Sequence, residues 1–300
     1  MADYEKIDTG PKFDGERQIR WDASSIDKAA SCHLLYKRSY LDGLRHRAGP
    51  WSGGARSWGS VMHAGLDAYD VARARQGVGS VLPLEAGVRA MIATGFKNED
   101  ENARTLGTAV RALAWYDHQY AEDGYQTAML PSGEPAIEVR FELPIPGTDY
   151  RFSGRMDRIV TQGSEVYIME HKTTTTTLGS YFFDRYHPSY QTGAYCWAAQ
   201  QLFGQPASGV IIDAIQTAVG FTRCARQTVT LSPSQLDEWF DAVRSQIDGV
   251  ELARAKGKWH PNFAACNNYG GCDYRSIDAL PPEFRDGLIA SEFQKEEKHS

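Results

Sequence analysis

Two acidic residues and a lysine in the middle of the chain have side chains that could bind a metal ion: Asp157, Glu170 and Lys172. Hard divalent cations take oxygen ligands, and phosphodiester hydrolysis uses activated water with positive charge beside the transition state. The two carboxylates would hold the ion, and Lys172 would orient the water or stabilise the developing charge. An isolated Asp and an E-x-K triplet are also common as surface ion pairs, so other segments have to support this hypothesis.

The sequence around these residues predicts a β-hairpin. Residues 150–160 and 165–172 are rich in β-formers, and Gly163 lies in the break between them. Asp157 would then lie on the first strand. Glu170 and Lys172 are two residues apart on the second strand, so they share one face, whereas His171 points to the other.

Two predicted helices contain polar residues that could complete the site. His63 follows Gly59 at a spacing of four, and the small Ala64 and Gly65 would allow close packing of that helix. Gln191 and Tyr195 are also four apart, so they share a face of a helix predicted over residues 190–203. Each of these side chains alone would be an ordinary core or surface residue. Their combination with the hairpin favours a shared site.

With these motifs the chain resembles the PD-(D/E)XK nucleases, over about residues 21–278. Within them it is similar to the RecB-like branch, which includes the AddB nuclease domain, CRISPR-associated adaptation nucleases and phage-encoded exonucleases. The resemblance implies that one or two Mg²⁺ or Mn²⁺ ions are bound, and that the strand of nucleic acid is positioned by Gln191 and Tyr195. The implied metal ligands are His63, Asp157, Glu170 and the backbone carbonyl of His171, with Lys172 as the catalytic lysine.

Glu138 is a further acidic residue on a predicted strand. It is similar to an acidic residue that some relatives place just before the strand with the Asp. It could be an additional carboxylate of the site, or a strand residue that faces solvent.

Three cysteines lie in contexts that resemble relatives with an iron–sulfur cluster: Cys32, Cys266 and Cys272. Such relatives use four cysteines, and here Asp278 takes the position of the last one. The resemblance implies a structural [4Fe-4S] cluster held by three thiolates and a carboxylate, although an oxygen ligand suits iron–sulfide poorly. The alternatives are Zn²⁺ at the same cysteines with Asp278 or His260, or reduced thiols without a metal.

Composition limits the class of protein. With 300 residues and 42% apolar content, the chain can form one large core or a core with a helical extension. No apolar run approaches membrane-spanning length and the N-terminus is polar, so we expect no membrane contact. Five cysteines without dense spacing fit a reducing compartment, so we expect a cytoplasmic protein. The net charge of −6 argues against a general nucleic-acid coat, so any basic surface must be local, for example in residues 37–47.

The expected fold class is α/β, with a restriction-endonuclease-like core, a mixed central sheet flanked by helices, and a helical N-terminal extension. The predicted regions are a polar lead (1–20), a helical region (21–130), the nuclease core (131–260) and a Cys-containing C-terminal segment with a mobile tail (261–300). The predicted strands cover residues 137–143, 150–160, 165–172, 209–215 and 221–231, and the predicted helices cover 25–44, 58–74, 84–96, 102–123, 190–203 and 233–256.

These features predict a metal-dependent DNA nuclease. The resemblance points to an exonuclease that acts on DNA ends or single strands in recombination, repair or phage replication, with a helicase or recombination protein as a partner. The competing class is a nuclease-like protein that binds DNA or a partner with little or no cleavage.

Overall fold

The computed structural model describes residues 9–15, 17–47, 55–75, 82–97, 104–204, 206–267 and 271–296. It divides into two compact units, each treated separately below. The first unit contains the described residues of Gly53–Phe141 and Arg155–Ser232. The second contains those of Asp8–Ser52, Glu142–Gly154 and Pro233–Ser300.

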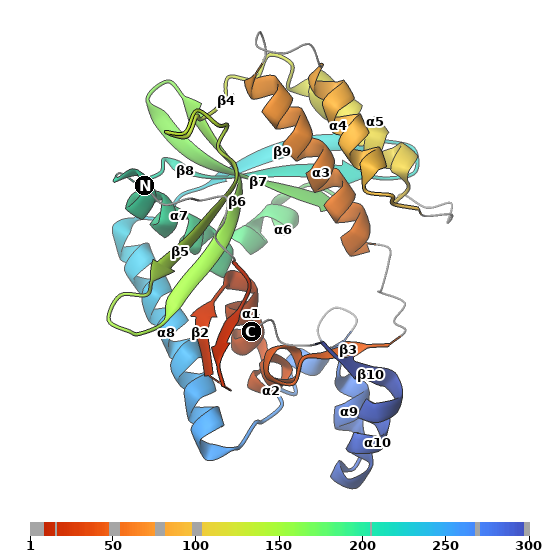
Figure 1. The fold of residues 1–300 in the computed structure, drawn as a ribbon, viewed down its shortest axis with the longest axis vertical. Coiled ribbons are helices and arrows are strands. Elements are labelled where there is room, and N and C mark those ends of the chain that lie inside the picture. Colours follow the sequence, from red (N-terminus) through yellow and green to blue (C-terminus); the bar gives the residue numbers. More distant parts are fainter. Residues whose placement is uncertain are drawn as a thin grey trace. The chain divides into compact units, whose positions relative to one another are not determined.

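The first unit is built on a mixed β-sheet (Figure 1). Strands β6 and β7 form the predicted antiparallel hairpin, β7 pairs with β8 in parallel, and β8 pairs with β9 antiparallel. Strands β4 and β5 also pair with β6. The strand bounds are β4 Gln126–Thr127, β5 Ile137–Pro144, β6 Arg151–Gln162, β7 Glu165–Thr174, β8 Gly209–Thr217 and β9 Thr222–Val229. The predicted α/β class with a mixed sheet is confirmed.

Helices of the first unit cover this sheet. Figure 1 shows α3, α4 and α5 side by side, in orange and yellow. The helix bounds are α3 Ala55–Ala74, α4 Pro83–Ala93, α5 Leu106–Gln119, α6 Ser180–Phe183, η2 Asp184–Tyr186 and α7 Tyr190–Phe203. Helix α7 begins after Ser189, whose hydroxyl accepts from the Thr192 N–H, and ends at Gly204 in the left-handed conformation. The helix predicted for Gln191 and Tyr195 therefore has the expected limits.

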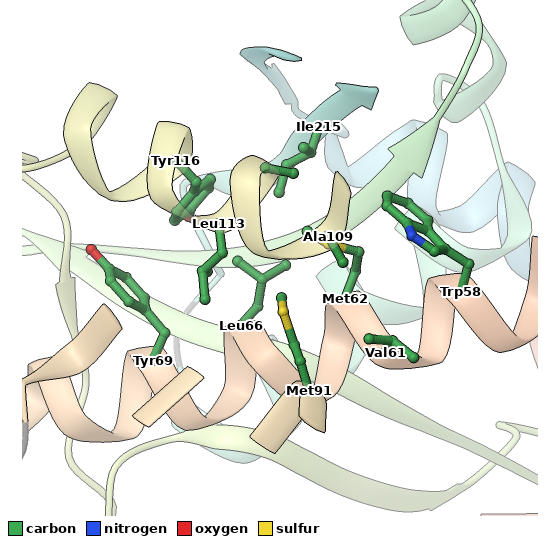
Figure 2. Packing of buried hydrophobic residues seen from close by; sticks show 11 residues of the cluster. Trp58, Val61, Met62, Leu66, Tyr69, Met91, Ala109, Leu113, Tyr116 and Ile215 are labelled. Atoms are coloured by element: carbon green, nitrogen blue, oxygen red, sulfur yellow. The ribbon is translucent and has the colours of Figure 1, made fainter. Parts of the chain in front are cut away.

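The apolar core between α3, α4, α5 and the sheet fixes the position of α3. Figure 2 shows Trp58, Met62 and Leu66 on one side of α3, with Leu113 of α5 and Ile215 of β8 opposite them. These side chains are at most 2% exposed. Burying apolar surface of this extent is the main favourable term in docking a helix on a sheet.

A close approach of α3 and α4 depends on glycine. A side-chain carbon added at Gly87 would lie 2.7 Å from the backbone oxygen of Gly65, and one added at Gly65 would overlap Met91. The close packing predicted from the small residues after His63 is thus confirmed at Gly65.

The second unit contains α8 Pro233–Lys256, which has the bounds predicted from Pro233. Its cluster of buried apolar residues contains Leu44, Tyr274, Ile277 and Phe293. The remaining elements are β1 Lys12–Asp14, β2 Arg17–Trp21, α1 Ala23–Ser31, α2 His33–Tyr36, the π-helix η1 Lys37–Leu41, β3 Leu44–His46, η3 Ala265–Asn267, α9 Arg275–Ala279, α10 Pro282–Glu292 and β10 Phe293–Lys295.

The prediction of a single helix over residues 25–44, which lie in the second unit, is wrong. Helix α1 begins earlier, because Asp22 is its N-cap and forms a capping box with Ser25. Cys32 then takes an extended conformation and interrupts the helix, and its sulfur accepts the N–H of Leu35 at the start of α2. Leu44 lies in strand β3.

The described parts of the predicted polar lead and C-terminal tail contain strands. Strand β2 buries Gln18 and Arg20, and their polar groups are paired: Gln18 accepts from the Tyr36 hydroxyl at 2.7 Å, and Arg20 contacts Glu142 at 3.1 Å. In the tail, Phe293 is 2% exposed and belongs to strand β10, which pairs with β3. Residues 1–8 and 297–300 lie outside the described part.

None of the described helices combines the length and the apolar character needed to cross a lipid bilayer.

Candidate active site

The β6–β7 hairpin brings the two predicted carboxylates together in the first unit. Asp157 on β6 accepts the backbone N–H of His171 on β7, at 2.9 Å from Oδ2. Glu170 is the preceding residue on β7, and both carboxylates are buried, with 5% and 4% of their surface exposed. The strand pairing continues from Arg158 opposite Met169, which fixes this register.

Lys172, Gln191 and Tyr195 surround the carboxylate of Glu170. Lys172 Nζ lies 2.6 Å from Glu170 Oε1, and Gln191 Nε2 donates to the same oxygen at 2.8 Å. The Tyr195 hydroxyl lies 3.0 Å from Glu170 Oε2 and 2.7 Å from the carbonyl of Arg155. Gln191 also accepts from Lys172 Nζ at 3.0 Å. The structure therefore joins four of the predicted catalytic residues in one hydrogen-bond network.

The two carboxylates have opposite pKa shifts. Burial, and then the charge of Glu170, raise the pKa of Asp157 well above its ordinary value. Burial also disfavours the charge of Glu170, but Lys172 and the hydrogen bond to Tyr195 hold the pKa of Glu170 below its usual range. Burial works against the ammonium of Lys172, yet Glu170 keeps its pKa above the ordinary value. A second positive charge would therefore be most favourable at Asp157.

His63 reaches the same carboxylate from α3. Its Nδ1 lies 3.6 Å from Asp157 Oδ2, which is beyond a hydrogen bond, and the buried Nδ1 has no hydrogen-bond partner within the described chain. Burial, together with the charge of His171, lowers the pKa of His63 to about 4. The imidazole is consequently neutral at physiological pH, which is the form that binds metals.

Two acidic residues near this centre are additional to the predicted set. Glu138 on β5 has a left-handed backbone (φ 56°), and its Oε2 lies 2.6 Å from Arg155. Its other oxygen is buried without a partner in the described chain. Asp67 lies one helical turn after His63, and burial followed by the charge of Glu138 raises its pKa to about 7. Unusual backbone conformations of non-glycine residues concentrate at functional sites.

His171 points to the opposite face of β7, as the strand period predicts. Its Nε2 lies 3.3 Å from Asp70 of α3, and its Nδ1 lies 3.5 Å from Asp213 of β8. Asp70 also pairs with Arg158 at 2.9 Å. Burial opposes the charge of His171, but the hydrogen bonds to Asp213 and Asp70 raise its pKa to about 10. This buried network of ions connects α3, and with it His63, to β7.

The sequence contains signals for this network that were not used. Asp213 interrupts an apolar run on a strand whose residues are all buried, and a buried charge needs a partner. Asp67 and Asp70 follow His63 at spacings of four and seven, which places all three near one face of a helix.

The donor set fits a divalent cation in its chemistry. Asp157 and Glu170 could supply oxygen ligands. Among the described residues, the Nδ1 of His63 and one buried oxygen of Glu138 have no hydrogen-bond partner and could bind the ion as well. As the side chains stand, no group of three or more His, Cys, Asp or Glu residues in the described ranges has a metal-binding arrangement. Glu170 is engaged by Lys172, Gln191 and Tyr195 instead.

The predicted cluster ligands lie in the second unit. The sulfur of Cys32 accepts the N–H of Asn262 at 3.2 Å, and the N–H of Cys272 donates to the carbonyl of Cys266 at 3.1 Å. Burial raises the pKa of Cys272, and the nearby Cys266 and Cys32 raise it further. The three cysteines therefore gather in one region, from segments more than 230 residues apart in the sequence.

Asp278 has a different role from the predicted fourth ligand. Its two carboxylate oxygens accept hydrogen bonds from Arg38 at 2.7 Å each, and the side chain of Arg38 is only 7% exposed. A bidentate pair of this kind uses the whole carboxylate. The four predicted residues do not fit a cluster in this arrangement, because Asp278 is committed to Arg38.

Comparisons with known proteins show what the chain as a whole is similar to. The sequence model described as "PD-(D/E)XK nuclease superfamily" matches residues 20–277. A crystal structure named "Putative exonuclease", from Eubacterium rectale, superimposes with a TM-score of 0.54 and 14% identity, over 88% of this chain and 89% of that one. The crystal structure of SSO0001 has a TM-score of 0.36 and 12% identity, over 88% and 86% of the two chains. No curated protein sequence matches the chain.

Proposed function

Because the chain belongs to the PD-(D/E)XK nuclease superfamily, we propose that it is a metal-dependent deoxyribonuclease whose centre is formed by His63, Asp157, Glu170 and Lys172. The observation that carries this proposal is that the two buried carboxylates lie beside the ammonium of Lys172 and the imidazole of His63, whose Nδ1 has no hydrogen-bond partner among the described residues. A surface ion pair, which was the alternative interpretation of the E-x-K triplet, would not be buried to this degree.

Each residue has a role that follows from its contacts. Asp157, Glu170 and the neutral His63 would hold Mg²⁺ or Mn²⁺, with the backbone carbonyl of His171 as a further ligand. When bound, such an ion supplies a Lewis acid for the phosphate and lowers the pKa of water. Lys172 keeps its proton beside Glu170 and can donate hydrogen bonds to the negative charge that develops on the phosphate.

Gln191 and Tyr195 act on Glu170. Their hydrogen bonds reach both of its oxygens and hold the carboxylate in one orientation. A ligand held in this way loses less conformational freedom when the ion binds.

The finer assignments also belong to this proposal. We propose that the protein is an exonuclease that acts on DNA ends or single strands, and that it belongs to the RecB-like branch. The name of the Eubacterium rectale structure, which shares the fold, agrees with exonuclease action. A role in recombination, repair or phage replication, a helicase or recombination protein as partner, and a cytoplasmic location stay predictions from the sequence. This proposal includes no [4Fe-4S] cluster, because Asp278 is paired with Arg38.

Cleavage of labelled single- and double-stranded DNA in the presence of Mn²⁺ tests the proposal. Lys172→Ala should lower the rate by about 100-fold or more, since removing one group that stabilises the transition-state charge has effects of this size. Lys97→Ala is the matched control, because Lys97 is an exposed lysine of the same unit. Equal and negligible cleavage by the wild type and both variants would reject the enzyme and favour the DNA-binding alternative.

A further inference from the structure

The segment that follows the catalytic strand has aromatic and cationic side chains on its surface. Tyr181 of α6 is 63% exposed, and Arg185 of η2 is exposed. The ring of Tyr186 lies 5.7 Å from Lys172 Nζ, measured to the ring centroid. Figure 1 shows α6 close to the C-terminal end of β7. The exposed Tyr181 and Arg185 therefore belong to the same short segment as Tyr186, whose ring reaches Lys172.

Other side chains of this segment are buried and hold its backbone in place within the first unit. Phe182 and Phe183 are 1% and 6% exposed, and the ring of Phe182 lies 5.6 Å from that of Tyr186. The hydroxyl of Thr192 on α7 donates to the carbonyl of Tyr186 at 2.9 Å. Tyr181 and Arg185 are therefore presented by a backbone held in place, which lowers the entropic cost of binding a ligand.

The charge of the segment suits a polyanion. Within residues 172–187 the charged groups are Lys172, Arg185 and Asp184, so the stretch has an excess of positive charge in a chain with a net charge of −6. No carboxylate of the described residues lies within ion-pair distance of Arg185, whose Nε donates to the carbonyl of Phe182 at 2.9 Å. The terminal nitrogens of its guanidinium group are suited to a phosphate, which they can bind with two hydrogen bonds.

We propose that residues 180–187 form a stacking platform for single-stranded DNA, in which Tyr181 and Tyr186 stack on bases and Arg185 contacts a phosphate beside the one at Lys172. This inference rests on the proposed nuclease function and names its substrate class. Bases of a single strand are open to stacking, whereas those of a duplex are already stacked and paired. Stacking on tyrosine tolerates every base, so the platform selects single strands without a sequence preference.

Binding of fluorescein-labelled oligo(dT) in EDTA tests the platform without cleavage, by fluorescence anisotropy. Tyr181→Ala should raise the Kd by about 5- to 100-fold, which is the range for removal of one stacking partner. Tyr181→Leu should weaken binding similarly, because it keeps an apolar side chain without the ring, and Tyr181→Trp should restore the affinity. Arg185→Ala should raise the Kd and reduce the slope of log Kd against log salt by about one.

Trp115→Ala is the matched control, because Trp115 is another exposed aromatic residue of the first unit, at 52%. Its Kd should equal that of the wild type. Wild-type affinity in Tyr181→Ala, equal losses in Tyr181→Ala and Tyr181→Trp, or no measurable binding by the wild type would each overturn the platform. A wild type that cleaves DNA while Tyr181→Ala keeps its affinity contradicts only the platform. A wild type that binds through Tyr181 but never cleaves contradicts only the nuclease.

Discussion

At the scale of single residues, the carboxylate of Glu170 is held by Lys172, Gln191 and Tyr195, which together contact both of its oxygens. Glu170 and Lys172 share a strand face because they are two residues apart, and Gln191 and Tyr195 share a helix face because they are four apart. Glu138 was not assigned, since nothing in the sequence announces its left-handed backbone. The pairing of Asp278 was not predicted, because its partner Arg38 lies 240 positions away in the sequence.

The residue-scale role of Gln191 can be tested by Gln191→Ala. This change removes the hydrogen bonds to Glu170 and Lys172, so the carboxylate is no longer held in one orientation. We expect the rate of DNA cleavage, or the affinity for Mn²⁺, to fall by about 10- to 100-fold. Gln201→Ala changes an exposed glutamine of the same helix and should have no effect. Equal kinetics of the two variants would rule out a supporting role for Gln191.

The charge of His171 predicts how stability depends on pH. Its folded-state pKa, about 10, is above the ordinary value of 6.5, so its contribution is complete below pH 6.5 and is lost as the pH rises towards 10. His171→Gln should lower the free energy of unfolding by about 3 kcal/mol or more at pH 6, since it leaves Asp70 and Asp213 with a missing partner. In urea unfolding, the difference from the wild type should shrink between pH 6.5 and 9.5. A difference that stays constant over this range would show that His171 is not charged in the folded protein.

At the scale of elements, the sequence predicts the helices and strands that have strong local patterns, and it misses those that are decided by tertiary contacts. The β6–β7 hairpin, α7 and α8 have clear turn, cap and proline signals, and they were predicted within a few residues. Strand β2 was missed because two of its buried residues, Gln18 and Arg20, are polar, and the groups that pair with them lie in distant segments. The break between α1 and α2 was missed because Cys32 is not a helix-breaking residue by type.

Two glycines in helices of the first unit, one at the α3–α4 crossing and one in α5, should respond to alanine with opposite changes in stability. Gly87→Ala should destabilise the protein by about 1–3 kcal/mol, because the new methyl group meets the backbone oxygen of Gly65. Gly107→Ala, in helix α5, meets only a side-chain oxygen at 3.8 Å and should stabilise by up to about 0.5–1 kcal/mol through helix propensity. Urea unfolding measures both changes. A neutral Gly87→Ala would mean that α3 and α4 do not approach each other this closely.

At the scale of the whole molecule, the site exists only after segments far apart in the sequence have come together. His63 is separated from Asp157 by almost a hundred residues, and the core of α3, α4, α5 and β8 brings them within 3.6 Å. The order of strands and helices around the hairpin was predictable from the sequence. The division into two units built from alternating chain segments was not, because such a division depends on contacts between distant residues.

Binding of Mn²⁺ measured by isothermal titration calorimetry tests the central claim most directly, because it reports on the assembled centre without a nucleic acid. The account predicts that the wild type binds Mn²⁺, and that Asp157→Asn and Glu170→Gln each weaken binding by at least about tenfold. Glu122→Gln, which changes an exposed acid of the same unit, should bind as the wild type does. Equal affinity in all four proteins, or no binding by the wild type, would contradict a metal centre at Asp157 and Glu170.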